Sequence, residues 1–168
     1  METNDSQYEN DRLEELGGSD FEIADGQPDI REWRVKDINE NYVGEADELI
    51  FDKTTRKVLY IVVDLDENEI GLTSRKVLVP IGLATLHEND DEVILAELAS
   101  RQLQNLPDYV KGKITNQMEA SIQHTFTGLA AAIAAGETTY QSHPDNFYQH
   151  EHFDQTRFYG SRKFKSGL

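Results

Sequence analysis

The stretch KVLYIVVDL, residues Lys57–Leu65, decides the fold. Its branched and aromatic residues favour a β-strand, and both alternating sets of side chains are mostly apolar. A strand that is apolar on both faces lies at the centre of a sheet or is covered on its outer side. We therefore expect Val58, Tyr60 and Val62 to be buried.

Shorter strands are predicted on both sides of this central one. KVLVPI, residues Lys76–Ile81, contributes Leu78 to the expected core, and Pro80 belongs at the strand's end because proline cannot donate to a ladder. Gly44 interrupts another strand pattern, as glycine does at a bulge or tight bend. The other expected strands are Arg31–Lys36, Tyr42–Phe51, Leu83–His87 and Glu92–Leu95. Short strands joined by turns predict a mainly β fold, either a barrel or a sandwich.

The chain outside these strands divides by composition. Residues 1–27 form a polar, acidic N-terminal arm, and residues 28–110 hold the strands. Residues 111–136 combine an amphipathic helix with an alanine-rich segment, and residues 137–168 form a tail rich in aromatic residues and histidine. In the arm, Tyr8–Leu16 predicts a short helix that the following glycines would end.

Two further helices are indicated in the second half. Ser100 is an expected N-cap for a short helix that ends before Pro107. Apolar residues then recur every four positions and give one stripe of a helix, namely Ile114, Met118, Ile122 and Phe126. This stripe packs on the chain's own strands or pairs with a partner or a second copy, and both readings stay open.

Charge and composition exclude several classes of function. The formal net charge is −16, which repels nucleic acids and anionic lipid, so we predict no nucleic-acid binding. There is no cysteine, which excludes disulfides and thiolate zinc sites. The longest apolar run, residues 129–135, has seven residues, whereas a membrane span needs about 20. The first residues lack a signal-peptide pattern, and we expect a cytoplasmic protein without membrane insertion.

No residue pattern predicts catalysis. The chain has neither a nucleophilic cysteine nor a G-x-S-x-G motif, and a lone His87 beside a strand is interpreted as structural. Asp64-x-Asp66-x-Asn68 resembles the start of a calcium loop. The loop's sixth and twelfth positions should be Gly and Glu but are Glu69 and Arg75, so we predict an acidic turn. We expect no enzyme and no cofactor.

The tail offers two kinds of site. His150 and His152 would share one face of a strand, and with His143 they are candidate metal ligands, although no second cluster completes four ligands. The aromatic residues come at irregular spacing and predict docking onto the chain's own strands or onto another protein. The expected interaction residues are Phe147, Tyr148, Phe153, Phe158 and Tyr159. We predict docking and no metal site, and keep a metal- or ligand-binding sensor as the alternative.

Two long stretches together resemble a known family. They are PDIREWRVKDINENYVGEADELIFDKTTRKVLYIVVDL and RKVLVPIGLATLHENDDEVIL, within which Val43-Gly44-Glu45 and Val77–Pro80 are matching features. They are similar to the PRC-barrel family, which includes stand-alone bacterial proteins and the cytoplasmic domain of the photosynthetic reaction-centre H subunit. The resemblance implies a small PRC barrel, closed or partly open.

The resemblance also implies a function. Barrels of this family bind proteins and share no catalytic set, so we expect a non-enzymatic adaptor connected with stress or with assembly of a larger complex. Its expected partner is another protein or a second copy of the chain. A part in photosynthetic electron transfer like that of the H subunit is a further alternative.

Overall fold

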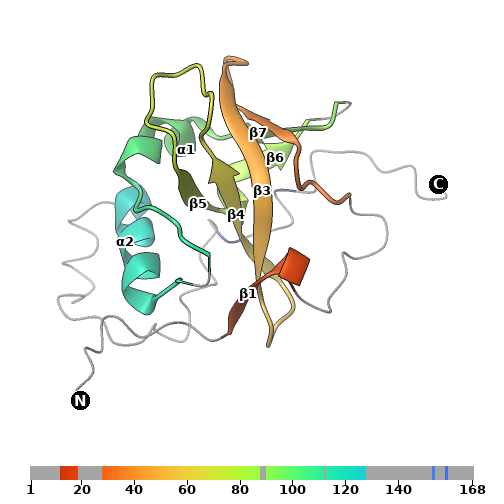
Figure 1. The fold of residues 1–168 in the computed structure, drawn as a ribbon, viewed down its shortest axis with the longest axis vertical. Helices are drawn as coiled ribbons and strands as arrows, with labels where there is room; N and C mark the ends of the chain where they lie inside the picture. Colours follow the sequence, from red (N-terminus) through yellow and green to blue (C-terminus); the bar gives the residue numbers. More distant parts are fainter. Residues whose placement is uncertain are drawn as a thin grey trace.

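Seven strands hydrogen-bond into one sheet in the described part of the chain, with short helices beside it (Figure 1). This computed structural model describes residues 12–18, 28–87, 90–111, 113–127, 153 and 158. The strands are β1 (Leu13–Glu15), β2 (Arg34–Lys36), β3 (Tyr42–Asp52), β4 (Val58–Asp64), β5 (Lys76–Pro80), β6 (Ala84–Leu86) and β7 (Glu92–Leu95).

The sheet follows the order β5-β4-β3-β2-β7-β6, and β1 pairs with the far end of β3. Neighbouring strands run antiparallel except β2 and β7, which are parallel. Strands β5 and β6 end this order, and no ladder joins them within the described residues. The prediction of a mainly β fold is therefore confirmed, with a partly open sheet in place of a closed barrel.

Strand β4 is the centre of the core, as its sequence predicts. It pairs with β3 on one side and with β5 on the other. Tyr60 and Val62 have no exposed surface, Leu78 of β5 is 1% exposed, and Val58 packs partly buried against the same cluster. Burial of a branched side chain stabilises a fold by about 1.5–3 kcal/mol, so this pair of strands supplies much of the stability.

Strand β3 passes so close to the end of β4 that only glycine fits at position 44. A Cβ atom on Gly44 would lie 1.9 Å from the carbonyl oxygen of Asp64. The facing strand β2 shifts its register between Val35 and Lys36, which is the irregularity that a glycine in a strand predicts. The bend lets β3 serve two neighbours along its length.

Helix α1 (Glu97–Gln102) begins earlier than its sequence indicates. The N-cap is Ala96, and the prediction that Ser100 caps the helix is wrong. The backbone N–H of Ala96 donates to the carbonyl oxygen of Leu83 at 2.8 Å, which holds Ala96 extended at the end of β7. The helix therefore starts directly after β7, and the hydroxyl of Ser100 donates within the helix to the carbonyl oxygen of Glu97 at 3.1 Å.

Helix α2 (Asn116–Thr127) packs on the chain's own core and contacts α1. Of the predicted stripe, Ile122 (1% exposed), Phe126 (7% exposed) and the partly buried Met118 lie in the helix, whereas Ile114, 7% exposed, precedes its first residue. The buried Glu119 accepts a hydrogen bond from the Tyr60 hydroxyl at 2.9 Å, which ties α2 to β4. Neither α2 nor any other helix in the described residues is long and apolar enough to span a membrane.

Three short 3-10 turns complete the described elements: η2 (Leu16–Gly18), η3 (Ile81–Leu83) and η4 (Leu103–Asn105). Turn η3 leads directly from β5 into β6, and its three residues are buried. Turn η4 extends α1 by a further turn.

The described part of the N-terminal arm belongs to the sheet. Leu13–Glu15 forms β1 beside residues 50–52 of β3, so the helix predicted for Tyr8–Leu16 is wrong where the structure describes it. The carbonyl oxygen of Arg12 accepts the N–H of Lys53 at 2.8 Å. The Arg12 guanidinium pairs with Asp52, which is 1% exposed. A helix that short is marginal in water, and these contacts favour the extended backbone.

Candidate functional site

A groove lies at the end of the sheet where β2 turns into β3, and it is the candidate functional site. It is called the end groove below, is open to solvent on one side and has a volume of about 340 Å³. Three segments that are far apart in the sequence line it. They are Asp37, Ile38 and Asn39 of the turn, Ile70 and Leu72 of the loop between β4 and β5, and Glu97, Ser100, Arg101 and Gln104 of α1 and η4.

The turn that forms the first wall is held by one buried carboxylate. Oδ1 of Asp37 accepts the backbone N–H groups of Asn39 and Asn41, each at 2.9 Å, and Oδ2 accepts the Asn41 side-chain amide at 3.1 Å. Burial acts to raise the pKa of Asp37, but the hydrogen bonds from Asn41 and Asn39 outweigh it and keep this pKa below the usual range. The neighbouring Ile38 is thereby fixed on a rigid turn.

The loop that forms the second wall is closed by Asn68. The side-chain amide of Asn68 donates to the carbonyl oxygens of Leu65 and Leu72, and its oxygen accepts the N–H groups of Ile70 and Leu72 at 3.1 and 2.9 Å. One side chain thus satisfies four backbone groups. This network holds the backbone of Ile70 and Leu72, and both side chains pack partly buried against the core.

The third wall is joined to the loop by Arg75. Its guanidinium donates to the carbonyl oxygens of Leu103 and Leu106 at 2.9 and 2.7 Å, at the end of the α1–η4 segment. Four residues of that segment face the groove at the spacing i, i+3, i+4 and i+7, which places them on one helical face. Hydrogen bonds of Asp37, Asn68 and Arg75 therefore hold the three walls of the groove.

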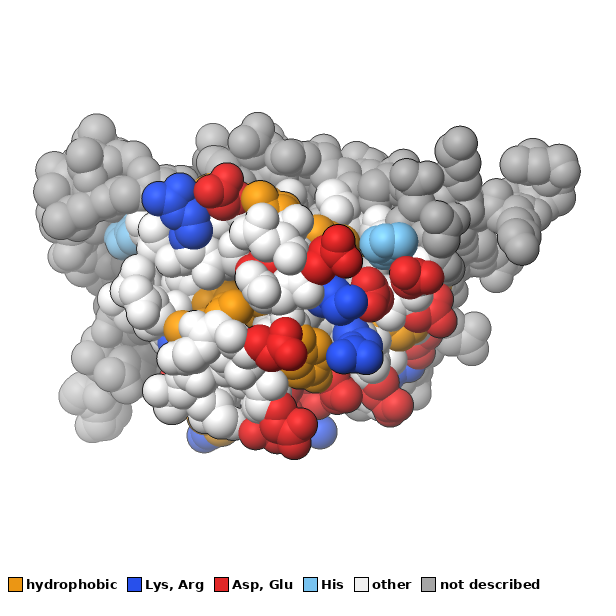
Figure 2. Space-filling model, turned by 90° about the horizontal axis from the view of Figure 1, so that it is seen from above, with side chains coloured by type: hydrophobic (Ala, Val, Ile, Leu, Met, Phe, Trp, Pro, Cys, Tyr) orange, Lys and Arg blue, Asp and Glu red, His pale blue; other side chains and the backbone are white. Residues whose placement is uncertain are grey.

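The groove combines an apolar floor with a polar rim. Ile38 is 53% exposed, an unusual position for a large apolar side chain, and lies beside the partly buried Ile70 and Leu72. Figure 2 looks down on this end of the molecule and shows hydrophobic side chains among acidic and basic ones. Its volume is at the lower end of the range for ligand pockets, about 300–1,000 Å³. The groove is therefore suited to one or two side chains of a binding partner.

Two of the predicted interaction residues lie in the core. Phe153 is 5% exposed and Phe158 fully buried, and the Phe153 ring meets the Tyr60 ring edge-on with centroids 5.3 Å apart. These two rings therefore dock on the chain's own strands and helices. Phe147, Tyr148 and Tyr159 lie outside the described residues, so docking of the tail onto another protein stays a prediction.

The candidate metal ligands of the tail cannot be placed. His143, His150 and His152 all lie outside the described residues, and the metal-binding alternative stays a hypothesis from the sequence. The calcium-like pattern is placed, and it forms a turn. Oδ1 of Asp64 accepts the N–H of Asp66 at 3.0 Å, while Asn68 is occupied by the loop's own backbone.

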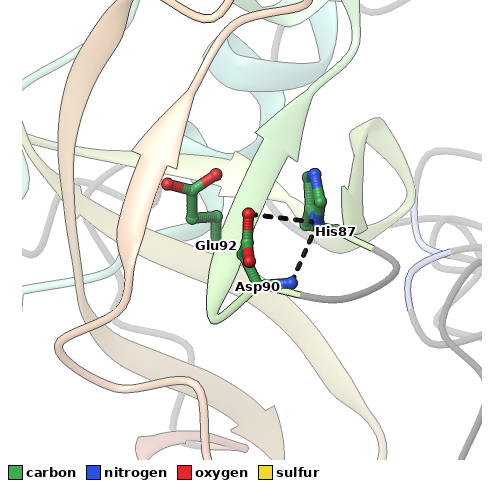
Figure 3. A group of neighbouring side chains, drawn as sticks. All are labelled: His87, Asp90 and Glu92. Carbon is green, nitrogen blue, oxygen red and sulfur yellow. Dashed lines mark hydrogen bonds and ion pairs between the residues drawn. The ribbon is translucent and has the colours of Figure 1, made fainter.

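One side-chain group that the sequence analysis did not predict surrounds His87. The ligand atoms of His87, Asp90 and Glu92 lie within 4.8 Å of one another (Figure 3). Nδ1 of His87 accepts the backbone N–H of Asp90 at 3.0 Å, and Oε2 of Glu92 pairs with Nζ of Lys36 at 2.8 Å. These contacts close the β6–β7 hairpin and tie it to β2, which agrees with a structural interpretation of His87.

The end groove itself was missed by sequence reasoning. Ile38 lies between the predicted strands Arg31–Lys36 and Tyr42–Phe51, Arg101 lies in the predicted helix, and no periodicity connects the two residues. The one signal available was an isoleucine inside an otherwise polar turn, Asp-Ile-Asn-Glu-Asn, since large apolar side chains are rare at such positions.

Comparison with known proteins adds one finding. The family model described as PRC-barrel domain matches residues 23–102. The match covers β2 to β7 and all of α1, and therefore every residue that lines the end groove except Gln104. No curated protein matches the chain.

Proposed function

Residues 23–102 belong to the PRC-barrel domain family, and from this premise we propose that the chain is a non-enzymatic protein-interaction module. It acts as an adaptor in the cytoplasm and takes part in the assembly of a larger complex. The domain supplies a rigid surface, and the partner is a protein.

The observation that carries this proposal is the exposed Ile38 beside the end groove. Ile38 is 53% exposed and, unlike a hydrophobic residue exposed singly, it shares a groove with the apolar side chains of Ile70 and Leu72, which together offer a partner a small apolar surface. The groove is formed before binding, so binding orders few side chains. Both properties are typical of protein-interaction surfaces.

The charge supports a protein partner over nucleic acid. The net charge of −16 disfavours contact with phosphate backbones, and it favours partners that carry basic surfaces. The groove also offers hydrogen-bond donors and acceptors at its rim, which protein interfaces use to fix orientation.

The test is affinity capture with the full chain as bait. Lysate of the source cells is passed over the immobilised chain, bound proteins are identified by mass spectrometry, and each candidate is purified and titrated against the chain. We expect at least one protein to bind saturably and in a fixed ratio. If no captured protein binds saturably once purified, the adaptor proposal is wrong.

A further inference from the structure

We propose that the end groove binds a short segment of a partner protein in which an aliphatic side chain is flanked by lysine or arginine. This inference rests on the proposed function and adds to it the site and the chemistry of the partner. Two independent properties of the groove, its apolar floor and its acidic rim, lead to it.

The apolar floor selects an aliphatic side chain. Ile38 stands 53% exposed at the edge, and Ile70 and Leu72 continue the apolar surface into the groove. The backbone that carries these three residues is held by the hydrogen bonds of Asp37 and Asn68. An incoming aliphatic group is therefore desolvated against a surface that is already ordered, which favours binding.

The rim selects positive charge. Asp37 and Glu97 line the groove itself, and the turn and loop next to it, residues 37–41 and 66–74, carry four further carboxylates and no lysine or arginine. Two hydrogen bonds between Tyr42 and Glu69 join the turn to the loop. The backbone N–H of Tyr42 donates to Oε1 of Glu69 at 3.0 Å, and the backbone N–H of Glu69 donates to the carbonyl oxygen of Tyr42 at 2.8 Å. Among the described residues that line the groove, Arg101 is the one base, and it lies 3.6 Å from Glu97. The surplus of negative charge attracts lysine and arginine on the partner.

A second copy of the chain is a poorer occupant. Each copy carries a net charge of −16, so two copies repel each other. The acidic walls would also face another acidic surface in a symmetric contact, because a two-fold interface uses the same patch on both subunits. The complementary occupant is a basic segment of a different protein.

The first experiment selects ligands of the groove from random peptides. A phage library of random 12-residue peptides is selected on the full chain and counted against two variants, Ile38→Ser in the groove and Val110→Ser outside it. Val110 is a matched control, since it is 57% exposed and does not line the groove. We expect peptides with an aliphatic residue between lysines or arginines, enriched on the wild type and on Val110→Ser but not on Ile38→Ser.

The second experiment measures how much individual side chains of the groove contribute to the affinity for a labelled peptide of the selected consensus. By fluorescence anisotropy, Ile38→Ser should weaken binding about tenfold, since part of an isoleucine's burial is lost. Glu97→Gln should weaken it about threefold, while Glu32→Gln, which removes an exposed carboxylate away from the groove, should leave it unchanged.

Three outcomes overturn the inference and leave the adaptor proposal to its own test. One is selection of acidic peptides, another is binding that is independent of Ile38, and the third is failure to select any peptide. Sedimentation of the full chain adds a fourth outcome. A dimer that Ile38→Ser dissociates would show that the groove receives a second copy and not a basic segment. The adaptor proposal fails separately, when no captured protein binds saturably.

Discussion

Replacing Arg75 with alanine should uncouple the loop after β4 from the segment that ends helix α1. The Arg75 side chain is 18% exposed and crosses between the two. The guanidinium donates four hydrogen bonds, to the carbonyl oxygens of Leu106 (2.7 Å), Leu103 (2.9 Å) and Gln104 (3.2 Å), and to Oδ1 of Asp108 (2.9 Å).

The size of the effect follows from which of these bonds water can replace. Asp108 is 70% exposed, so its ion pair with Arg75 is screened and contributes little. The bonds to Leu103 and Leu106 are partly buried, and a hydrogen bond with a charged donor contributes about 1.5–3 kcal/mol when water is excluded. Water reaches part of the freed carbonyl groups, so we expect Arg75→Ala to lower the free energy of unfolding by about 2–3 kcal/mol.

Urea denaturation of the full chain, followed by circular dichroism, measures this loss. With a slope of about 2 kcal/mol per molar urea, the midpoint should fall by about 1–1.5 M. The matched control is Arg101→Ala, because Arg101 is 73% exposed and its one ion pair among the described residues is with Glu97 of the same helix, at 3.6 Å. The control should lose less than about 0.5 kcal/mol. Equal midpoints for the two variants would refute the reasoning.

Three further results are expected. In thermal melts, Gly44→Ala should lower the free energy of unfolding by about 3 kcal/mol, because the added Cβ would lie 1.9 Å from the backbone oxygen of Asp64. Gly71→Ala is the control: its Cβ has open space and only a φ of +80° disfavours it, so the loss should be about 1 kcal/mol. Phe158→Ala should lower the free energy of unfolding, measured in urea, by about 3–5 kcal/mol, because the Phe158 ring has no exposed surface. An unchanged urea midpoint would place the ring outside the core. The pKa of Asp37 is lowered on folding from 3.8, so its contribution is full above that value and is lost as the pH falls through the folded pKa. The stability difference between wild type and Asp37→Asn should shrink as urea titrations move from about pH 5 to pH 2, and a constant difference would contradict this assignment.

The strands could be predicted because their signals are local. Alternation and β-branching locate β4 and β5 within one residue of their ends, and Pro80 ends β5 as expected. Gly44 marks an irregularity in the neighbouring strand, because the absent side chain is itself visible in the sequence. The apolar stripe of α2 likewise shows which face is buried.

The errors arise where distant residues decide the local structure. Ser100 has the chemistry of an N-cap, but a hydrogen bond from Ala96 to Leu83 starts the helix earlier. The arm has the composition of a short helix, but Asp52 holds Arg12 beside β3. The end groove could not be predicted for the same reason. The hydrogen bonds from Arg75 to Leu103 and Leu106 join positions about 30 residues apart and follow no periodicity.

The pairing of β1 with β3 has a practical consequence for any shortened form of the protein. The family match begins at residue 23, so a fragment cut there would lack Leu13–Glu15 and leave the backbone of residues 50–52 as a bare edge. Asp52 would also lose the guanidinium of Arg12. Bare strand edges recruit other strands, so such a fragment would be prone to strand exchange and aggregation. A fragment that begins at residue 12 would carry its own edge protection.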